Sequence, residues 1–302
     1  MTIIPPYLKP GDTIGLVSPA GYMPQEDYAT SIEILQQWGF KVQVGKTPGH
    51  QFHYFSGTDE ERLNDLQHMM DDKNIHAILC VRGGYGTGRI IDKLNFKKFN
   101  QHPKWIIGFS DITVLHSHLF SNYKTASLHA PMSAAFNEEE YKNEFIQSLR
   151  AALSGQKAKY IAPIHPFNQN GKGSGVLVGG NLSLLVNLIG TPSDIKTKNK
   201  ILFMEDLGEY IYNVDRMMRH LQRTGKLDHL KGLIVGGFTE MKDTTIPFGQ
   251  TTEEVIKEIV KDYKFPVCFN FPVSHDKENY ALKVGVKYKL SVTDKEVKLT
   301  ES

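Results

Sequence analysis

The sequence has few cysteines, no long apolar run and no excess of one charge sign. Its 302 residues include only Cys80 and Cys268, and both lie within apolar segments. We therefore expect buried thiols in a reducing compartment and not a disulfide framework. No apolar run approaches the roughly 18 residues that a membrane-spanning helix needs. The 35 basic and 33 acidic residues leave no polybasic segment for nucleic acid or a membrane surface.

What is present is typical of an ordinary globular protein. Hydrophobic residues make up 40% of the chain and charged residues 23%. Residues 1–6 show no charged segment followed by an apolar stretch, so we expect no signal peptide. The length suits one large domain or two of ordinary size. We expect a soluble cytoplasmic protein that binds neither nucleic acid nor membranes.

The first half of the chain alternates between strand-like and helix-like segments. Short apolar runs predict strands at Thr13–Val17, Lys41–Val44, Ala77–Val81, Trp105–Gly108 and Ala126–Leu128. Between the first three of these runs, apolar periodicity predicts helices over Asp27–Trp38 and Asp59–Met70, the second capped by Thr58. This alternation indicates an α/β domain with a mostly parallel sheet and helices on both of its faces.

The second half predicts a smaller α/β domain that contains antiparallel strands. A helix over Glu138–Leu153 ends the N-terminal domain, residues 1–153. The stretch Ser154–Ser174 is rich in Gly, Pro, Asn and Lys, so we interpret it as a linker. Residues 175–302 then form the C-terminal domain, whose tail alternates between apolar and polar residues from Ala281 to Leu299.

A single serine follows the buried run that ends at Gly108. Ser110 stands between this predicted strand and a helical pattern with Ile112, Leu115 and Leu119 on one face. A serine on such a turn exposes its hydroxyl, and the helix N-terminus offers N–H groups to an oxyanion. The pattern indicates a hydrolase nucleophile. The alternative is that Ser110 or Asp111 simply caps the helix, because the usual elbow has a second glycine where this chain has Ile112.

A glycine-rich turn follows the third predicted strand. Its sequence, Arg82-Gly83-Gly84-Tyr85-Gly86-Thr87-Gly88, lets backbone N–H groups approach an anion or an oxyanion closely. The spacing fits neither the dinucleotide fingerprint nor a P-loop, so nucleotide binding is disfavoured. The turn can also be purely structural.

Two residues of the second half complete a possible catalytic set. Glu205 ends an apolar run and would need a partner if it is buried, and His275 follows a predicted strand. A base oriented by an acid is what activates a serine, although a loop acid and a lone loop histidine are usually uninformative. We expect no metal and no cofactor. His116 and His118 fall on different faces of a helix, and no zinc-binding motif is present.

Taken together, the segments resemble the LD-carboxypeptidase family, serine peptidases that include the microcin C7 self-immunity proteins. The matching segments occur in family order and span nearly the whole chain. They are Gly11-Asp12-Thr13-Ile14-Gly15, Ser18-Pro19-Ala20, Arg82-Gly83-Gly84-Tyr85-Gly86, Gly108-Phe109-Ser110-Asp111-Ile112-Thr113, His129-Ala130-Pro131-Met132, Gly179-Gly180-Asn181-Leu182-Ser183, Glu205-Asp206, Tyr212, Asp215-Arg216, His275 and Asn279.

The resemblance implies a triad in which Ser110 is the nucleophile, His275 the base and Glu205 its orienter. It implies cytoplasmic recycling enzymes that remove the terminal D-alanine from murein tetrapeptides, cutting the bond between an L-centre and a D-residue through an acyl-enzyme. It also implies a homodimer, and an active site in the groove between the two domains.

The remaining site residues follow from this mechanism. The N–H groups of Asp111 and of the Gly83–Gly84 turn are expected to hold the oxyanion. Arg82 is a candidate for the substrate carboxylate, unless it pairs structurally with an acid. Asn181 is a further candidate for a substrate contact.

The chain departs from the family pattern at two glycines. The family commonly has Gly before the catalytic His, where this chain has Ser274, and His-Gly-Pro where it has Ala130. A positive φ in either family glycine would make the replacement costly, by about 1 kcal/mol. Two rival functions stay open: hydrolysis of an aminoacyl-nucleotide antibiotic with the same triad, and ligand binding by two lobes without catalysis.

Overall fold

The computed structural model describes residues 2–136 and 142–302, and the chain forms two compact units. Unit 1 comprises Met1–Gln156 and Tyr280–Val284, and unit 2 comprises Lys157–Asn279 and Gly285–Ser302. The chain therefore returns once from unit 2 to unit 1 for a short segment near its C-terminus. Among the described residues, no helix has the length and apolar character needed to cross a bilayer.

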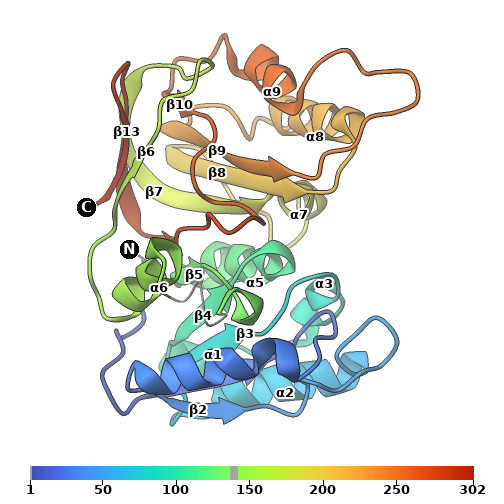
Figure 1. Cartoon of the computed structure of the whole chain (residues 1–302), viewed down its shortest axis with the longest axis vertical. Helices are drawn as coiled ribbons and strands as arrows, with labels where there is room; N and C mark the ends of the chain where they lie inside the picture. The colour runs from blue at the N-terminus through green and yellow to red at the C-terminus, as the bar shows by residue number, and fades with distance from the viewer. Residues whose placement is uncertain (1, 137–141) are drawn as a thin grey trace. The chain divides into compact units, whose positions relative to one another are not determined.

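Unit 1 is built on a mostly parallel sheet (Figure 1). In the described part of the chain this sheet has six strands in the order β11-β5-β4-β3-β1-β2. All neighbours pair in parallel except β11, which is antiparallel to β5. The strands are β1 (Thr13–Val17), β2 (Lys41–Val44), β3 (Ala77–Cys80), β4 (Trp105–Gly108), β5 (Ser127–His129) and β11 (Leu282–Val284). The strand order reverses between β1 and β3, which is where ligand sites of such sheets gather, beyond the strands' carboxyl ends.

The helices of unit 1 form two groups. They are α1 (Glu26–Gln37), α2 (Asp59–Asp71), α3 (Thr87–Ile90), α4 (Lys97–Gln101), α5 (Thr113–His118) and α6 (Glu144–Leu153). Helix α2 contacts α3 and α4, and α3 contacts α5. Trp38, at the end of α1, packs instead against Phe136 and under Arg150 of α6. Right-handed crossovers in this strand order place α1 on one face and α2 to α5 on the other.

Unit 2 contains a mixed sheet. Its described strands lie in the order β10-β9-β8-β7-β12-β13-β6, parallel from β10 to β7 and antiparallel from β7 to β6. The strands are β6 (Lys159–Ala162), β7 (Gly171–Asn181), β8 (Lys200–Leu207), β9 (Gly232–Thr239), β10 (Val267–Cys268), β12 (Lys287–Val292) and β13 (Val297–Glu301). The helices are α7 (Leu182–Asn187), α8 (Ile211–Arg223) and α9 (Thr252–Val260).

The fold class predicted from the sequence is confirmed, including the parallel N-terminal sheet and the antiparallel strands of the smaller C-terminal unit. Thr58 caps α2 with a reciprocal capping box, as predicted. The predicted helix over Glu138–Leu153 begins later, at Glu144, and its residues 138–141 lie outside the described residues.

The stretch Ser154–Ser174, predicted as a linker, contributes strands to the sheet of unit 2. It contains β6 and the start of β7, because β6 pairs with β13 and β7 pairs with β12 far along the chain. The C-terminal tail also differs, since its first strand, β11, joins the sheet of unit 1. Single-sequence patterning does not report such long-range pairings.

Candidate active site

Ser110 occupies a strained turn at the carboxyl end of β4. Its φ is 61°, in the left-handed region that disfavours residues with a Cβ. A short 3-10 turn, Ser110–Ile112, leads from it into α5, and neither the turn nor α5 has a side-chain N-cap. The capping alternative is therefore wrong for Ser110. Strain of this kind persists where the surrounding structure enforces it, and it is common at functional sites.

His116 of α5 bonds to the last residue of β4. It is fully buried, and burial lowers the pKa of its imidazole to about 4, so the ring is neutral at physiological pH. Its Nε2 lies 2.8 Å from the Gly108 carbonyl oxygen and its Nδ1 lies 2.8 Å from Ser127 Oγ. Because a carbonyl only accepts, Nε2 donates and Nδ1 accepts the Ser127 hydroxyl. The imidazole thus ties β4 to β5 two residues before the serine.

The glycine-rich turn packs directly against Ser110. A Cβ built on Gly83 would lie 3.0 Å from Ser110 Cβ and 3.2 Å from its Oγ. Gly21, in the loop after β1, donates its N–H to the Gly83 carbonyl at 3.0 Å. Gly84 has a φ of +95°, and a Cβ there would meet the Tyr54 hydroxyl at 2.8 Å. Gly83 therefore admits the close approach of the main chain to the serine, and Gly84 supplies the left-handed backbone of the turn.

Asp111 and Arg82 flank the same turn. Asp111 is buried, and its Oδ2 accepts the Thr87 N–H at 2.8 Å. Burial raises the pKa of this carboxyl, and hydrogen bonds from Thr87 and Gly86 partly offset that effect. The Arg82 Nη1 donates to the Tyr22 carbonyl at 2.6 Å, so the main chain anchors this guanidinium. Arg82 forms no ion pair with an acidic side chain among the described residues.

Glu205 and His275 form a buried acid–imidazole pair in unit 2. Glu205 lies in β8 and is fully buried, and the His275 side chain is 12% exposed. The His275 Nδ1 lies 2.6 Å from Glu205 Oε2. Burial opposes the imidazolium, but the hydrogen bond and charge of Glu205 outweigh it, and the pKa of His275 is raised. The pair therefore has the bonding of an oriented general base.

Two glycines in β9 allow this pair to form. Met204 pairs with Val235 and Asp206 pairs with Phe238, so the register shifts opposite Glu205, where Gly236 and Gly237 lie. A Cβ on Gly236 would lie 2.2 Å from the Val273 carbonyl oxygen, and one on Gly237 would lie 2.5 Å from Ser274 Cβ. The bulge lets the loop that carries His275 pack against the sheet beside Glu205. We did not predict these residues, although a Gly-Gly pair inside an apolar run is a signal for a bulge.

Asn181 has a structural setting at the start of α7. Its Oδ1 accepts the Leu184 N–H, and its Nδ2 donates to Asp206 Oδ1 at 2.8 Å. Asp206 is also buried and accepts the N–H groups of Ser183 and Leu207. Burial and the neighbouring Glu205 raise the pKa of Asp206 to about 6 despite these bonds. A substrate contact of Asn181 stays a prediction.

The predicted site residues thus fall into two groups. Unit 1 brings together Ser110, Asp111, Gly83, Gly84 and Arg82, and unit 2 brings together Glu205, His275 and, through Asp206, Asn181. Neither Ser274 nor Ala130 has a positive φ, so the two departures from the family glycines introduce no backbone strain. Among the residues that the structure describes, no group of His, Cys, Asp or Glu side chains is arranged to hold a metal ion.

Comparisons with known proteins identify the family of the chain. Residues 14–130 match the model of the LD-carboxypeptidase N-terminal domain, and residues 174–290 match that of the LD-carboxypeptidase C-terminal domain. The chain is 33% identical to the probable murein peptide carboxypeptidase of Bacillus subtilis strain 168, over 96% of this chain and 92% of that protein.

Two further relatives cover nearly the whole chain. The Escherichia coli microcin C7 self-immunity protein MccF is 27% identical, over 97% of this chain and 94% of that protein. The crystal structure of muramoyltetrapeptide carboxypeptidase from Oxalobacter formigenes superposes with a TM-score of 0.84 at 26% identity, over 96% of this chain and 98% of that one.

Proposed function

Because the chain belongs to the LD-carboxypeptidase family, and is an enzyme of that serine peptidase class, we propose that it removes the C-terminal D-alanine from murein tetrapeptides. The bond cut would join an L-centre to the D-residue. The observation that carries the proposal is the 2.6 Å hydrogen bond between His275 Nδ1 and Glu205 Oε2. A neutral imidazole fixed in this way presents Nε2 as a base for a serine hydroxyl.

In the proposed mechanism Ser110 Oγ attacks the scissile carbonyl while His275 Nε2 takes its proton. The C–N bond then breaks, the imidazolium gives that proton to the leaving amine, and D-alanine departs. Water, activated by the same imidazole, attacks the acyl-enzyme ester and releases the tripeptide acid and Ser110. Glu205 holds the tautomer and stabilises the imidazolium throughout.

The oxyanion would be held by the N–H groups of Asp111 and of the Gly83–Gly84 turn. Within the described residues, neither Asp111 nor Gly84 donates its N–H to an internal partner. The Gly83 carbonyl accepts the Gly21 N–H. In a trans peptide the carbonyl and the N–H that follows it point in opposite directions, so the Gly84 N–H points away from Gly21. Each such donor typically contributes about 3 kcal/mol to barrier lowering.

Arg82 is our candidate for the substrate carboxylate. Among the described residues its guanidinium donates through Nη1 alone, to the Tyr22 carbonyl, so the group is fixed and keeps further N–H groups for an anion. Asn181 is the candidate in unit 2. We further propose that the enzyme works in the cytoplasm as a homodimer, on small murein peptides and without metal or cofactor. Sedimentation would measure its oligomeric state.

The decisive experiment compares the wild-type protein with Ser110→Ala on a murein tetrapeptide. We expect wild type to release D-alanine, and the variant to lose at least about 10⁴-fold in kcat. A fluorophosphonate should label Ser110 in the wild type and not in the variant. Ser174→Ala, at an exposed position on β7, is the control. Undiminished D-alanine release by Ser110→Ala would contradict the mechanism.

The second candidate is hydrolysis of an aminoacyl-nucleotide, favoured by the nearly full-length match to the microcin C7 self-immunity protein. The same triad would serve, with a different pocket for the leaving group. Parallel assays on the tetrapeptide and on a processed microcin separate the two. Turnover of the microcin alone would replace the murein assignment.

A further inference from the structure

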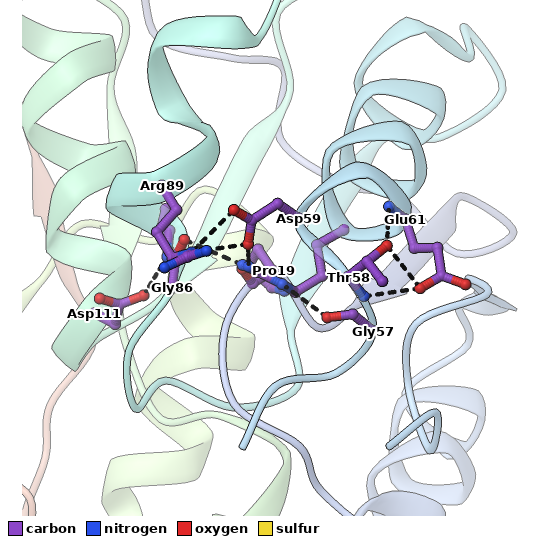
Figure 2. Close-up of polar contacts among 10 residues, drawn as sticks. Pro19, Gly57, Thr58, Asp59, Glu61, Gly86, Arg89 and Asp111 are labelled. Atoms are coloured by element: carbon purple, nitrogen blue, oxygen red, sulfur yellow. Dashed lines mark hydrogen bonds and ion pairs between the residues drawn. The ribbon is translucent and has the colours of Figure 1, made fainter. Parts of the chain in front are cut away.

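Arg62 is a fully buried arginine that neither the triad nor the oxyanion donors use. It lies on α2, away from the glycine-rich turn in the sequence, and its guanidinium donates to main-chain carbonyls from three separate loops. The contacts are Nη1 to Pro19 at 2.5 Å, Nη1 to Gly86 at 3.1 Å and Nε to Gly57 at 3.3 Å. Its Nη2 donates to the Asp59 carboxylate. Figure 2 labels the four partners, Pro19, Gly57, Asp59 and Gly86, and marks these contacts with dashed lines.

The Gly86–Thr87 peptide unit is held from both sides. Its carbonyl accepts from Arg62, and its N–H donates to Asp111 Oδ2 at 2.8 Å, as Figure 2 shows for Gly86 and Asp111. One peptide group thus bridges the buried Arg62 guanidinium and the buried Asp111 carboxyl group, and hydrogen bonds are stronger in such a low-dielectric setting than in water. A Cβ on Gly86 would lie 2.7 Å from Arg62 Nη1, so only glycine fits between them.

This bridge connects directly to the nucleophile. Asp111 follows Ser110 in the chain, and Gly86 ends the turn whose Gly83 packs on Ser110. The same guanidinium also holds Pro19, two residues before Gly21, which donates to the Gly83 carbonyl. Arg62 therefore reaches the glycine turn along two independent routes.

Resting on the proposed function, we propose that Arg62 is a positioning residue of the active site: with Asp111 it fixes the Gly86–Thr87 peptide and thereby sets the distance between the Gly83–Gly84 turn and Ser110. Arg62 touches no substrate. It acts through the main chain, so its loss would reduce the rate of acylation and leave substrate affinity nearly unchanged. A misplacement of about 1 Å can cost on the order of 100-fold in rate.

The test uses the full-length protein with Arg62→Ala and Arg62→Lys, and Arg89→Ala as the matched control. Arg89 also donates to Asp59, but its side chain is 45% exposed and it binds none of the three carbonyls. The readouts are the rate of fluorophosphonate labelling at Ser110, kcat and KM on the tetrapeptide, and rescue by added guanidinium. The labelling rate does not depend on the identity of the peptide substrate.

We expect Arg62→Ala to lower both the labelling rate and kcat by about 100-fold, with KM changed less than about 3-fold. Guanidinium at millimolar concentration should restore part of the rate in Arg62→Ala only. Arg62→Lys keeps the buried charge and is the variant to use if Arg62→Ala does not fold. We expect a loss of about tenfold or more from it, since one ammonium group lacks the planar fork that reaches three loops.

Wild-type labelling rates in folded Arg62→Lys or Arg62→Ala would overturn the positioning role, as would an equal loss in Arg89→Ala. A rise in KM with unchanged kcat would overturn it as well. Failure of wild-type Ser110 to label would contradict the proposed function itself, so the two failures are distinguishable.

Discussion

The two units build their parts of the proposed site by different physical means. In unit 1 the proposed part is made of main chain: a left-handed Ser110, a glycine turn that packs against it, and the N–H groups proposed to hold the oxyanion. In unit 2 it is made of side chains: a buried carboxylate bonded to an imidazole whose pKa it raises. Steric fit therefore determines the geometry in unit 1, and electrostatic interaction determines the protonation of the imidazole in unit 2. Small steric changes should therefore disturb unit 1, and changes of charge or pH should disturb unit 2.

The two units also differ in how their glycines are used. In unit 1, Gly83 lets its loop pack against Ser110, the proposed nucleophile. In unit 2, Gly236 and Gly237 let a loop pack against the sheet, and His275 of that loop bonds to Glu205. The same property, a missing Cβ, thus acts directly at the proposed nucleophile in unit 1 and one contact away from the proposed base in unit 2.

Glu205→Gln, in unit 2, is expected to have the largest effect that distinguishes the two units. The effect should be a change in the pH dependence of kcat/KM. Because the base must be neutral, wild-type kcat/KM should fall as the pH falls through the raised pKa of His275, above 6.5. The amide removes the charge that raises this pKa, so the acid limb should move to lower pH. We also expect a loss of about 10³-fold to 10⁴-fold in kcat.

Glu209→Gln is the control for this change, because Glu209 follows β8 by two residues and its carboxylate accepts a hydrogen bond from Asn213, which lies outside the proposed triad. Its pH profile and kcat should match the wild type. An unshifted acid limb in Glu205→Gln would show that Glu205 does not set the titration of His275.

A smaller effect is expected from Gly83→Ala, which tests shape without charge. The new Cβ would crowd Ser110 at 3.0 Å, and we expect kcat to fall by about 10-fold to 100-fold with no shift in the pH profile. Gly88→Ala is the matched control, since a Cβ there meets nothing within 4 Å and Gly88 lies in α3. It should keep wild-type kcat and raise the free energy of unfolding by up to about 1 kcal/mol. A pH shift in Gly83→Ala would contradict the division into shape and charge.

Much of the fold was predictable because its signals are local. Apolar runs predict the strands of the parallel sheet, and Thr58 predicts the start of α2, where the structure shows a capping box with Glu61. The departure of β11 to the sheet of unit 1 was not predictable, since its pairing with β5 spans more than 150 residues. Strand partners depend on tertiary packing, which a single sequence does not display.

The candidate site follows from the sequence as a set of residue types, without its geometry. The motifs of Ser110, Glu205 and His275 resemble those of a known family, and the structure places the last two within hydrogen-bond distance, while their catalytic roles stay predictions. The left-handed φ of Ser110 carries no sequence signal, because only glycine, asparagine and aspartate favour that region. The role of Arg62 was equally hidden, since its partners are carbonyl groups, which every residue has.

The smallest effects are expected where the chain departs from the family glycines, with one position in each unit. Neither Ala130 nor Ser274 has a positive φ, so glycine would relieve no strain at either. Ala130→Gly should lower the free energy of unfolding by about 1 kcal/mol, through the added freedom of the unfolded chain. Ser274→Gly should cost about 2 kcal/mol, because its Oγ also donates to the Glu278 carbonyl and accepts the Asp276 N–H.

Urea unfolding and tetrapeptide kinetics measure both changes, and kcat should fall less than about tenfold in either variant. The Ser274 hydroxyl orders the loop that carries His275, so any loss of kcat should be larger in Ser274→Gly than in Ala130→Gly. An increase in kcat from Ser274→Gly would contradict the ordering role of the Ser274 hydroxyl. It would mean that the reacting loop adopts, during turnover, a conformation that only the family glycine permits, and that shape governs unit 2 as well.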